Sequence, residues 1–501
     1  MNGIKSNHQE DPLPDHDFHS VWGCSYSARS TLHDPAIRKL WEQYLVSPVS
    51  VDRQYHVLLG SYTNLFADFF GGYYPISLHA HATDALLPTT IASLVLNTVA
   101  TSPLILNSEE LRPKANEEPE ETGSRIRDFS LELLGWTEAH VQKPTFVAIE
   151  GIYGAGFGPL AHTSKEWEVQ AIASGPPPIV VNLKTRPSFS EIDTQFAAAK
   201  AQGAIAVVFD MVSTEDGSVL SVEQYAQLKL AAQRNRLLII VDETMTAIRC
   251  GAPFAFQRPE YNTNIKVKHS TNGVNGNSTN GANSTIPIQP DLVIFGKGLG
   301  ISGVAIGFSG PITHAFTYIE RADILQSILY WRALVSRPIR TPVLIEALGT
   351  LTTARKECWP ARSETIGATI RGILHDLEPS TREPDAVRGL GAMIALDREI
   401  AMRLRVQSAI RRRSPWVRWL PKLDAGNTDR ELLMQCVFGK ESREQRNVLS
   451  VDAADMGTMP LWCFVCGIQA TEEAWCRECF LGICGNEVCL DAFGHHTCIA
   501  A

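Results

Sequence analysis

The sequence predicts an α/β fold with a mainly parallel sheet flanked by helices, and two observations support this. First, short apolar runs that suit buried strands alternate with segments of helical length from Phe146 onward. Second, two of these runs are followed at once by charged residues, the first by Asp242 and the second, after one glycine, by Lys297. Because ligands of open α/β sheets bind at the carboxyl ends of strands, these two residues mark a candidate site.

The elements follow from apolar patterning and from residues typical of helix ends. Pro35 suits the first turn of a helix at its position. The acidic, proline-containing stretch at 108–122 predicts a surface loop. Strands separated by helices of this length indicate parallel pairing with right-handed crossovers. In chain order we expect helices at 33–45 and 85–99, a strand at 146–149, a helix at 190–202, a strand at 204–209, a helix at 222–235, strands at 237–241 and 292–295, and helices within 324–355.

The length of 501 residues allows two or three domains. We expect a polar leader at 1–32, a large domain at 33–345, a small C-terminal domain at 346–455 and a Cys/His-rich module at 456–501. Within the large domain, an insert at 262–286 is rich in Asn, Gly, Ser and Thr. It lacks the apolar side chains that would order it, so it predicts a flexible surface loop.

Composition and charge narrow the class of protein. The formal net charge of -9 argues against a general nucleic-acid binder, whose surface should be basic. No stretch approaches the roughly 20 uninterrupted apolar residues of a membrane span. The N-terminus has the pattern of neither a secretory signal nor a transit peptide. We therefore expect a cytoplasmic enzyme that binds neither membrane nor nucleic acid.

Asp242 and Lys297 together predict pyridoxal-phosphate chemistry. An acid that holds a pyridinium nitrogen and a lysine that forms a Schiff base are the two protein groups that this cofactor needs. For either residue alone, a surface charge after a strand is the simpler interpretation. Their shared position after two buried strands favours a common site.

Four segments occur in one order along the chain: Ile149 to Gly154, the Asp242-Glu243 pair, the run Lys297 to Gly300, and Val387 to Ile394 with its Arg-Gly-Leu-Gly core. In this order they resemble segments of the class III (ornithine/ω-type) pyridoxal-phosphate aminotransferases of fold type I. The resemblance covers about 33–397. It implies a fold-type-I pyridoxal-phosphate transferase that forms a homodimer and moves an amino group between an amino acid or amine and a keto acid.

The resemblance also implies how the cofactor is held. Lys297 forms the Schiff base and then acts as the general base, and Asp242 keeps the pyridine nitrogen protonated. Tyr153 stacks on the ring, although an ordinary core tyrosine is the alternative. Ala82 and Thr83 stand where the family binds the phosphate, and their N–H groups at a helix start suit that role.

Two further residues are implied for the substrate. Arg388 matches the arginine that offers a planar fork to a substrate carboxylate. Glu215 matches the acid that pairs with this arginine until substrate arrives. The alternative for this pair is an ion pair with a purely structural role.

The sequence departs from the family at several positions. Met245 replaces a glutamine that contacts the cofactor, and the phosphate turn lacks its glycine. The run Gly154 to Gly156 removes a possible substrate arginine. Two alternatives to transamination therefore stay open. One is a pyridoxal-phosphate enzyme with a changed reaction, such as a racemase, decarboxylase or lyase, and the other is a catalytically silent scaffold that binds a protein partner through its C-terminal module.

The C-terminal module carries the pattern of a zinc site. Seven of the 11 cysteines lie between Cys463 and Cys498, and two Cys-x2-Cys pairs provide thiolates on tight turns. Seven cysteines and one histidine make eight ligands, enough for two structural Zn²⁺ ions. A reduced or disulfide-linked tail is the alternative, and His496 could replace His495. The expected ligands are Cys463, Cys466, Cys476, Cys479, Cys484, Cys489, His495 and Cys498.

Overall fold

A computed structural model gives the coordinates of the chain. The residues that it describes are 34–52, 54–79, 85–100, 105, 108–152, 160, 177–214, 216–261, 289–307, 339–383, 385–403, 416–419 and 423. The expected polar leader, the Asn-rich insert and the Cys/His-rich module lie outside these residues.

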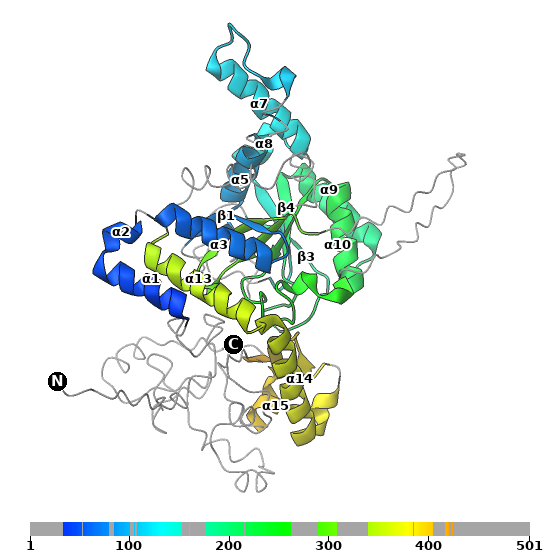
Figure 1. Ribbon diagram of the computed structural model, residues 1–501. Helices are drawn as coiled ribbons and strands as arrows, with labels where there is room; N and C mark the ends of the chain where they lie inside the picture. The colour runs from blue at the N-terminus through cyan, green and yellow to red at the C-terminus, as the bar shows by residue number, and fades with distance from the viewer. Residues whose placement is uncertain are drawn as a thin grey trace, which may run out of the picture.

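A seven-stranded sheet forms the centre of the molecule (Figure 1). Its strand order is β1-β7-β6-β5-β4-β2-β3. β7 runs antiparallel to both of its neighbours, and the other adjacent strands pair in parallel, so six strands point the same way. The bounds are β1 Tyr74–His79, β2 Thr145–Ile149, β3 Ile179–Val181, β4 Ala204–Phe209, β5 Leu238–Asp242, β6 Leu292–Phe295 and β7 Ser302–Ile306.

Helices cover both faces of this sheet, and alternate residues of each strand face opposite layers. In β5, Ile239 and Val241 join one apolar cluster, whereas Leu238 and Ile240 join the other. The first cluster includes side chains of α3 (Tyr55–Phe69), α9 (Phe189–Ala201), α10 (Val222–Arg234) and α13 (Thr341–Lys356). The second includes side chains of α5 (Pro88–Ala100) and α7 (Pro119–Leu134). Because both faces are buried, the strands are apolar throughout rather than alternating.

A second, smaller sheet lies beyond the end of α13, next to α14 (Figure 1). It has three antiparallel strands in the order β10-β9-β8. Its strands and neighbouring helices are β8 Val387–Arg388, β9 Ile394–Asp397, β10 Trp416–Trp419, α14 Trp359–Leu377 and α15 Arg398–Arg403. The remaining elements are α1 Pro35–Val46, α2 Pro48–Asp52, α8 Glu138–Gln142 and the 3-10 turns η3 Glu109–Leu111, η5 Ala255–Gln257, η6 Pro259–Tyr261, η7 Lys297–Leu299 and η8 Pro379–Arg382.

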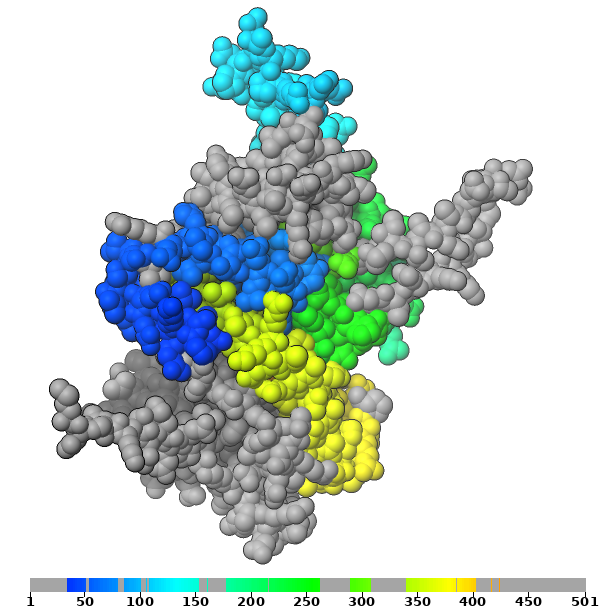
Figure 2. All heavy atoms as spheres, in the orientation of Figure 1, coloured from blue at the N-terminus to red at the C-terminus, as the bar shows by residue number. Residues whose placement is uncertain are grey.

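The four strands expected at 146–149, 204–209, 237–241 and 292–295 match β2, β4, β5 and β6 to within one residue at each end, but one expected loop was wrong in part. Its last four residues, 119–122, are the start of α7, which begins at Pro119 and continues to Leu134. Proline suits the first turn of a helix, and Glu120 and Glu121 stabilise that turn through the helix dipole. Figure 2 shows α7 projecting from the body of the molecule in cyan. The helix expected at 85–99 begins later, at Pro88.

Among the described residues, none of the helices combines the length and the apolar character that a membrane span requires. The proposed division into domains stays a prediction; its boundary at 345/346 falls within α13.

Candidate active site

Asp242 and Lys297 lie at the carboxyl ends of two adjacent parallel strands. Asp242 is the last residue of β5 and pairs with Ile294 of β6. The next N–H, that of Glu243, donates to the carbonyl oxygen of Ile294 at 2.8 Å. Lys297 follows Ile294 by three residues, so both charged groups lie at one edge of the sheet. The strand register thus brings together the two residues predicted to hold the cofactor.

The Asp242 carboxyl is buried and only half satisfied. Its Oδ1 accepts a 2.9 Å hydrogen bond from the N–H of Thr244. Its Oδ2 is buried and has no hydrogen-bond partner among the residues that the structure describes. Burial raises the pKa of Asp242, while the Thr244 hydrogen bonds and the positive charge of Lys297 act in the opposite direction. An unpaired buried carboxylate oxygen is costly, and a cationic partner at Oδ2 would remove that cost.

The backbone turns sharply at Lys297. This residue has φ 49°, in the left-handed region that side chains other than glycine seldom adopt. It opens the single 3-10 turn η7, whose end is closed by Gly300, also left-handed, donating its N–H to the Lys297 carbonyl at 2.9 Å. Backbone strain of this kind often occurs at functional sites, where the surrounding structure holds it in place.

Glu243 anchors the loop that follows Asp242. Its side chain is fully buried, where it accepts hydrogen bonds from the hydroxyl of Thr246 and from the N–H of Phe256 at 3.3 Å. Burial raises the pKa of Glu243 to about 7. Phe254 of the same loop stacks on Phe70 with ring centroids 4.2 Å apart. Together these contacts hold the loop beside Asp242 in one conformation.

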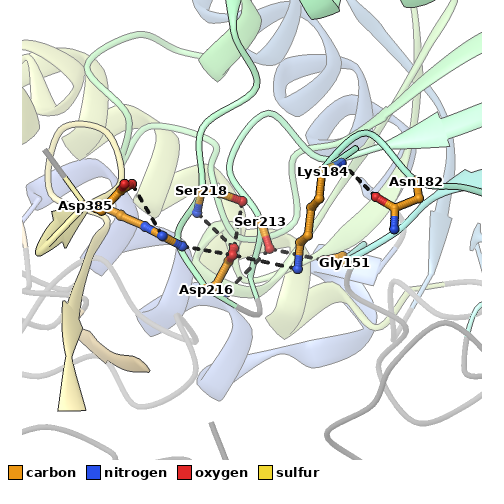
Figure 3. Close-up of polar contacts among 8 residues, drawn as sticks. Gly151, Asn182, Lys184, Ser213, Asp216, Ser218 and Asp385 are labelled. Carbon is orange, nitrogen blue, oxygen red and sulfur yellow. Dashed lines mark hydrogen bonds and ion pairs between the residues drawn. The ribbon is translucent and has the colours of Figure 1, made fainter. Parts of the chain in front are cut away.

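A second cluster of charges lies around Asp216, in the turn that follows β4 (Figure 3). Arg388 of β8 donates from Nη1 to Asp216 Oδ2 at 3.1 Å, and Lys184 Nζ lies 3.9 Å from the same oxygen. The guanidinium of Arg388 also lies 4.0 Å from the ring centroid of Trp416. A weaker contact of 3.4 Å joins Arg388 to the exposed Asp385. Arg388 is thus held by the turn that follows β4 and by β10 of the small sheet.

Asp216 itself is held rigidly. Its Oδ1 accepts the N–H of Ser218 at 3.0 Å and the hydroxyl of Ser218 at 2.7 Å (Figure 3). Burial acts to raise its pKa, but the hydrogen bonds from Ser218 and Ser213 and the charge of Lys184 bring the pKa below its ordinary value. The Asp216 side chain is therefore ionised near neutral pH and forms an ion pair with Arg388.

Comparison with solved structures identifies the fold. Lysine aminotransferase from M. tuberculosis matches over 83% of this chain and 87% of its own, with TM-score 0.51 and 15% identity. A mutant protein from the same bacterium matches over 86% and 89%, with TM-score 0.54 and 15% identity. The chain has the aminotransferase fold.

The match is to the fold and not to the sequence. Ornithine aminotransferase from Toxoplasma gondii is only 13% identical, with TM-score 0.47 over 76% of this chain and 75% of its own. Neither a protein-family model nor a curated protein matches the sequence. The predicted fold class, fold type I with a mainly parallel sheet and flanking helices, is nevertheless confirmed.

Within this aminotransferase fold, the structure describes three of the predicted site residues: Asp242, Lys297 and Arg388. Asp242 lies near enough to Lys297 for the lysine charge to act on its pKa, and Arg388 donates a hydrogen bond to an acidic side chain. The acid that the structure describes there is Asp216, the neighbour of the predicted Glu215. The other predicted residues, Ala82, Thr83, Tyr153, Glu215 and the eight zinc ligands, lie outside the described residues.

Sequence reasoning missed three members of the Arg388 cluster: Asp216, Lys184 and Trp416. Asp216 had a signal, because it stands between Glu215 and Gly217 in the turn where an acid was expected. Lys184 and Trp416 come from segments far away in sequence, and no pattern linked them to Arg388. Among the described residues, no group of three or more His, Cys, Asp or Glu is arranged to hold a metal ion.

Proposed function

We propose that this chain is a pyridoxal-phosphate-dependent aminotransferase that moves an amino group between an amino acid or amine and a keto acid. The observation that supports this most directly is the buried, unpartnered Oδ2 of Asp242 on the strand next to the one that leads to Lys297. The aminotransferase fold of the chain agrees with the proposal.

The described residues Asp242 and Lys297 have the chemistry that the cofactor requires. A protonated pyridine nitrogen is the kind of cationic donor that the Asp242 Oδ2 lacks. Such a donor would act against the burial that raises the pKa of Asp242 and would favour its ionised form. Lys297 supplies the amine that would hold the cofactor covalently. Tyr153, Ala82 and Thr83 remain the proposed contacts for the ring and the phosphate.

Asp242 and Lys297 would have separate tasks in the reaction. When bound, pyridoxal phosphate supplies an electron sink that makes the proton on the amine-bearing carbon acidic. Asp242 holds a proton on the pyridine nitrogen by charge and hydrogen bonding. Lys297 accepts the substrate proton at Nζ and returns it at a neighbouring position, which is general acid–base work.

Arg388 would bind the substrate carboxylate. A guanidinium can donate two parallel hydrogen bonds to a carboxylate, and this one is oriented by Asp216 and by the Trp416 ring. Because Ser218 holds Asp216 in place, Asp216 would orient Arg388 rather than swing away from it. The proposed substrates are amino acids and keto acids that carry a carboxylate, alongside simple amines.

The absorbance spectrum of the purified protein tests this proposal. We expect a visible band from bound pyridoxal phosphate, changed by a panel of amino acids and restored by a keto acid. A Lys297→Ala variant should lack the covalent form of the cofactor. Restoration by a keto acid would distinguish transamination from racemase, decarboxylase or lyase chemistry. A colourless protein that ignores added cofactor would contradict the proposal and favour a silent scaffold.

Three further proposals concern the whole chain. The Cys/His-rich module would bind two structural Zn²⁺ ions and could also serve a protein partner. The protein would act as a homodimer, and it would work in the cytoplasm without binding nucleic acid. Sedimentation tests the dimer: a monomer that is fully active would contradict it.

A further inference from the structure

The turn that follows Arg388, residues 389–391, is held by one face of α14. Four residues of this helix, spaced for one face, contact it or the loop that follows Asp242: Ser363, Glu364, Gly367 and Arg371. In Figure 1, α14 lies beside the small sheet that holds Arg388. The two arginines, Arg371 and Arg388, are thus parts of one packed unit.

Arg371 makes the most specific contact in this unit. Its Nη1 donates to the carbonyl oxygen of Gly391 at 3.0 Å, and its Nη2 donates to that of Gly389 at 2.9 Å. A planar guanidinium is suited to bridging two carbonyl groups, whereas the single nitrogen of a lysine is not. Burial lowers the pKa of Arg371, but an arginine pKa starts so high that the side chain stays charged.

The bridged turn has little freedom of its own. Gly389 has φ 99° and Gly391 has φ 52°, conformations that favour glycine. A Cβ at Gly391 would clash with the carbonyl oxygen of Arg249, and one at Gly367 would clash with the carbonyl oxygen of Gly391. The backbones of α14, the turn and the Arg249 loop are therefore in close contact.

The same turn is joined to the loop that follows Asp242. The N–H of Ala392 donates to the carbonyl oxygen of Arg249 at 2.8 Å. In addition, the N–H of Gly251 donates to the hydroxyl of Ser363 on α14 at 3.0 Å. The position of Arg388 relative to Asp242 thus depends on contacts made through this helix face and turn.

We infer that Arg371 is a positioning residue for Arg388: by bridging the carbonyl groups of Gly389 and Gly391, it determines where the Arg388 guanidinium meets a substrate carboxylate. The inference rests on the proposed function, in which Arg388 binds that carboxylate. Arg371 acts only through the turn, so its loss should weaken the binding of substrates that carry a carboxylate and spare those that do not.

Two variants test this by different means. Arg371→Met removes both hydrogen bonds, and Gly367→Ala pushes the turn with a methyl group while keeping Arg371. Protein loaded with pyridoxamine phosphate is reacted in single turnovers with 2-oxoglutarate, which carries carboxylates, and with butanal, which carries none. Both variants should raise the half-saturating concentration of 2-oxoglutarate by about tenfold, the scale of one hydrogen bond to a charged group. The half-saturating concentration of butanal and the maximal rate should change by less than about twofold.

Arg362→Met is the matched control, because Arg362 lies on the same helix and pairs with Glu357 instead of the turn. This variant should leave the half-saturating concentrations of both substrates unchanged. Arg371→Lys, which keeps one donor nitrogen, should give an intermediate effect, and it decides the question if Arg371→Met does not fold. Equal losses for both substrates, or no loss for 2-oxoglutarate, would overturn the role of Arg371. A wild-type protein that reacts with neither substrate would instead overturn the proposed function.

Discussion

The guanidinium of Arg388 donates a 3.1 Å hydrogen bond to Asp216, a residue 172 positions earlier in the chain. The contact joins the small sheet to the turn after β4 of the large sheet. The Arg388 guanidinium also lies over the Trp416 ring. Ser213 and Ser218, which form hydrogen bonds with Asp216, belong to the same turn as Asp216. If Arg388 binds the substrate carboxylate as proposed, this orientation exists before substrate arrives.

Replacing Arg388 by lysine should weaken substrate binding. Lysine keeps the charge but loses the planar fork and the stacking on Trp416. We expect KM for a carboxylate-bearing substrate to rise by about 10- to 100-fold with a smaller change in kcat, the range for one charge-assisted hydrogen bond. Lys184→Met is the comparison, because Lys184 is half exposed and makes a long contact, 3.9 Å, with Asp216. Its effect should stay below about threefold, and equal effects of the two variants would contradict the assignment.

Replacing Asp242 by asparagine should leave the fold intact and impair catalysis. Asparagine has the same shape but cannot hold a proton on the pyridine nitrogen by charge. We expect kcat to fall by at least about 100-fold, a typical cost of removing one electrostatic contact at a reacting group. Asp291→Asn provides a control, since Asp291 is equally buried but precedes β6 at the opposite end of the sheet. A normal kcat in Asp242→Asn would contradict the role of Asp242.

Asp291 should make stability depend on pH. Burial raises its pKa to about 7, although its Oδ2 accepts the N–H of Ile239 at 2.8 Å. Because the folded state binds this proton more tightly than the unfolded state, the stabilisation is complete below about pH 4 and is lost as the pH rises through 7. Asparagine at this position does not titrate, so the Asp291→Asn variant lacks this pH-dependent contribution to stability.

Urea unfolding of the wild type and Asp291→Asn at several pH values measures the effect. Between pH 5 and pH 8, the free energy of unfolding of the wild type should fall relative to the variant by about 2 to 3 kcal/mol, at about 1.4 kcal/mol per pKa unit. The contribution of Glu243, whose pKa is also about 7, is the same in both proteins and cancels. Parallel pH profiles would show that Asp291 does not titrate in this range.

The C-terminal module should bind two zinc ions per chain. A segment of about 40 residues has too little apolar core to fold alone, so metal would supply its stability. Elemental analysis should find two equivalents of zinc, and a Cys476→Ser, Cys479→Ser double variant should lose at least one. Cys358→Ser, which changes an exposed cysteine outside the module, should lose none. Zinc-free wild-type protein that keeps its full stability would exclude a structural role for the metal.

The sequence was most informative where local patterns carry the signal. Buried parallel strands need apolar residues on both faces, so β4, β5 and β6 could be read directly from their runs. The charged residues directly after two of these runs then marked the site. The start of α7 was missed because a proline with nearby acids is common to surface loops and to first helical turns.

By itself, the sequence therefore determined the α/β class, the places of β2, β4, β5 and β6 along the chain, and the pairing of Asp242 with Lys297 as a candidate site. Only the tertiary structure decided which strands are neighbours, that Asp216 is a partner of Arg388, and that Arg371 bridges the turn beside it. The physical reason is one of range. Strand and helix patterns are set by neighbouring residues, whereas hydrogen bonds between distant segments depend on how packed layers bring those segments together.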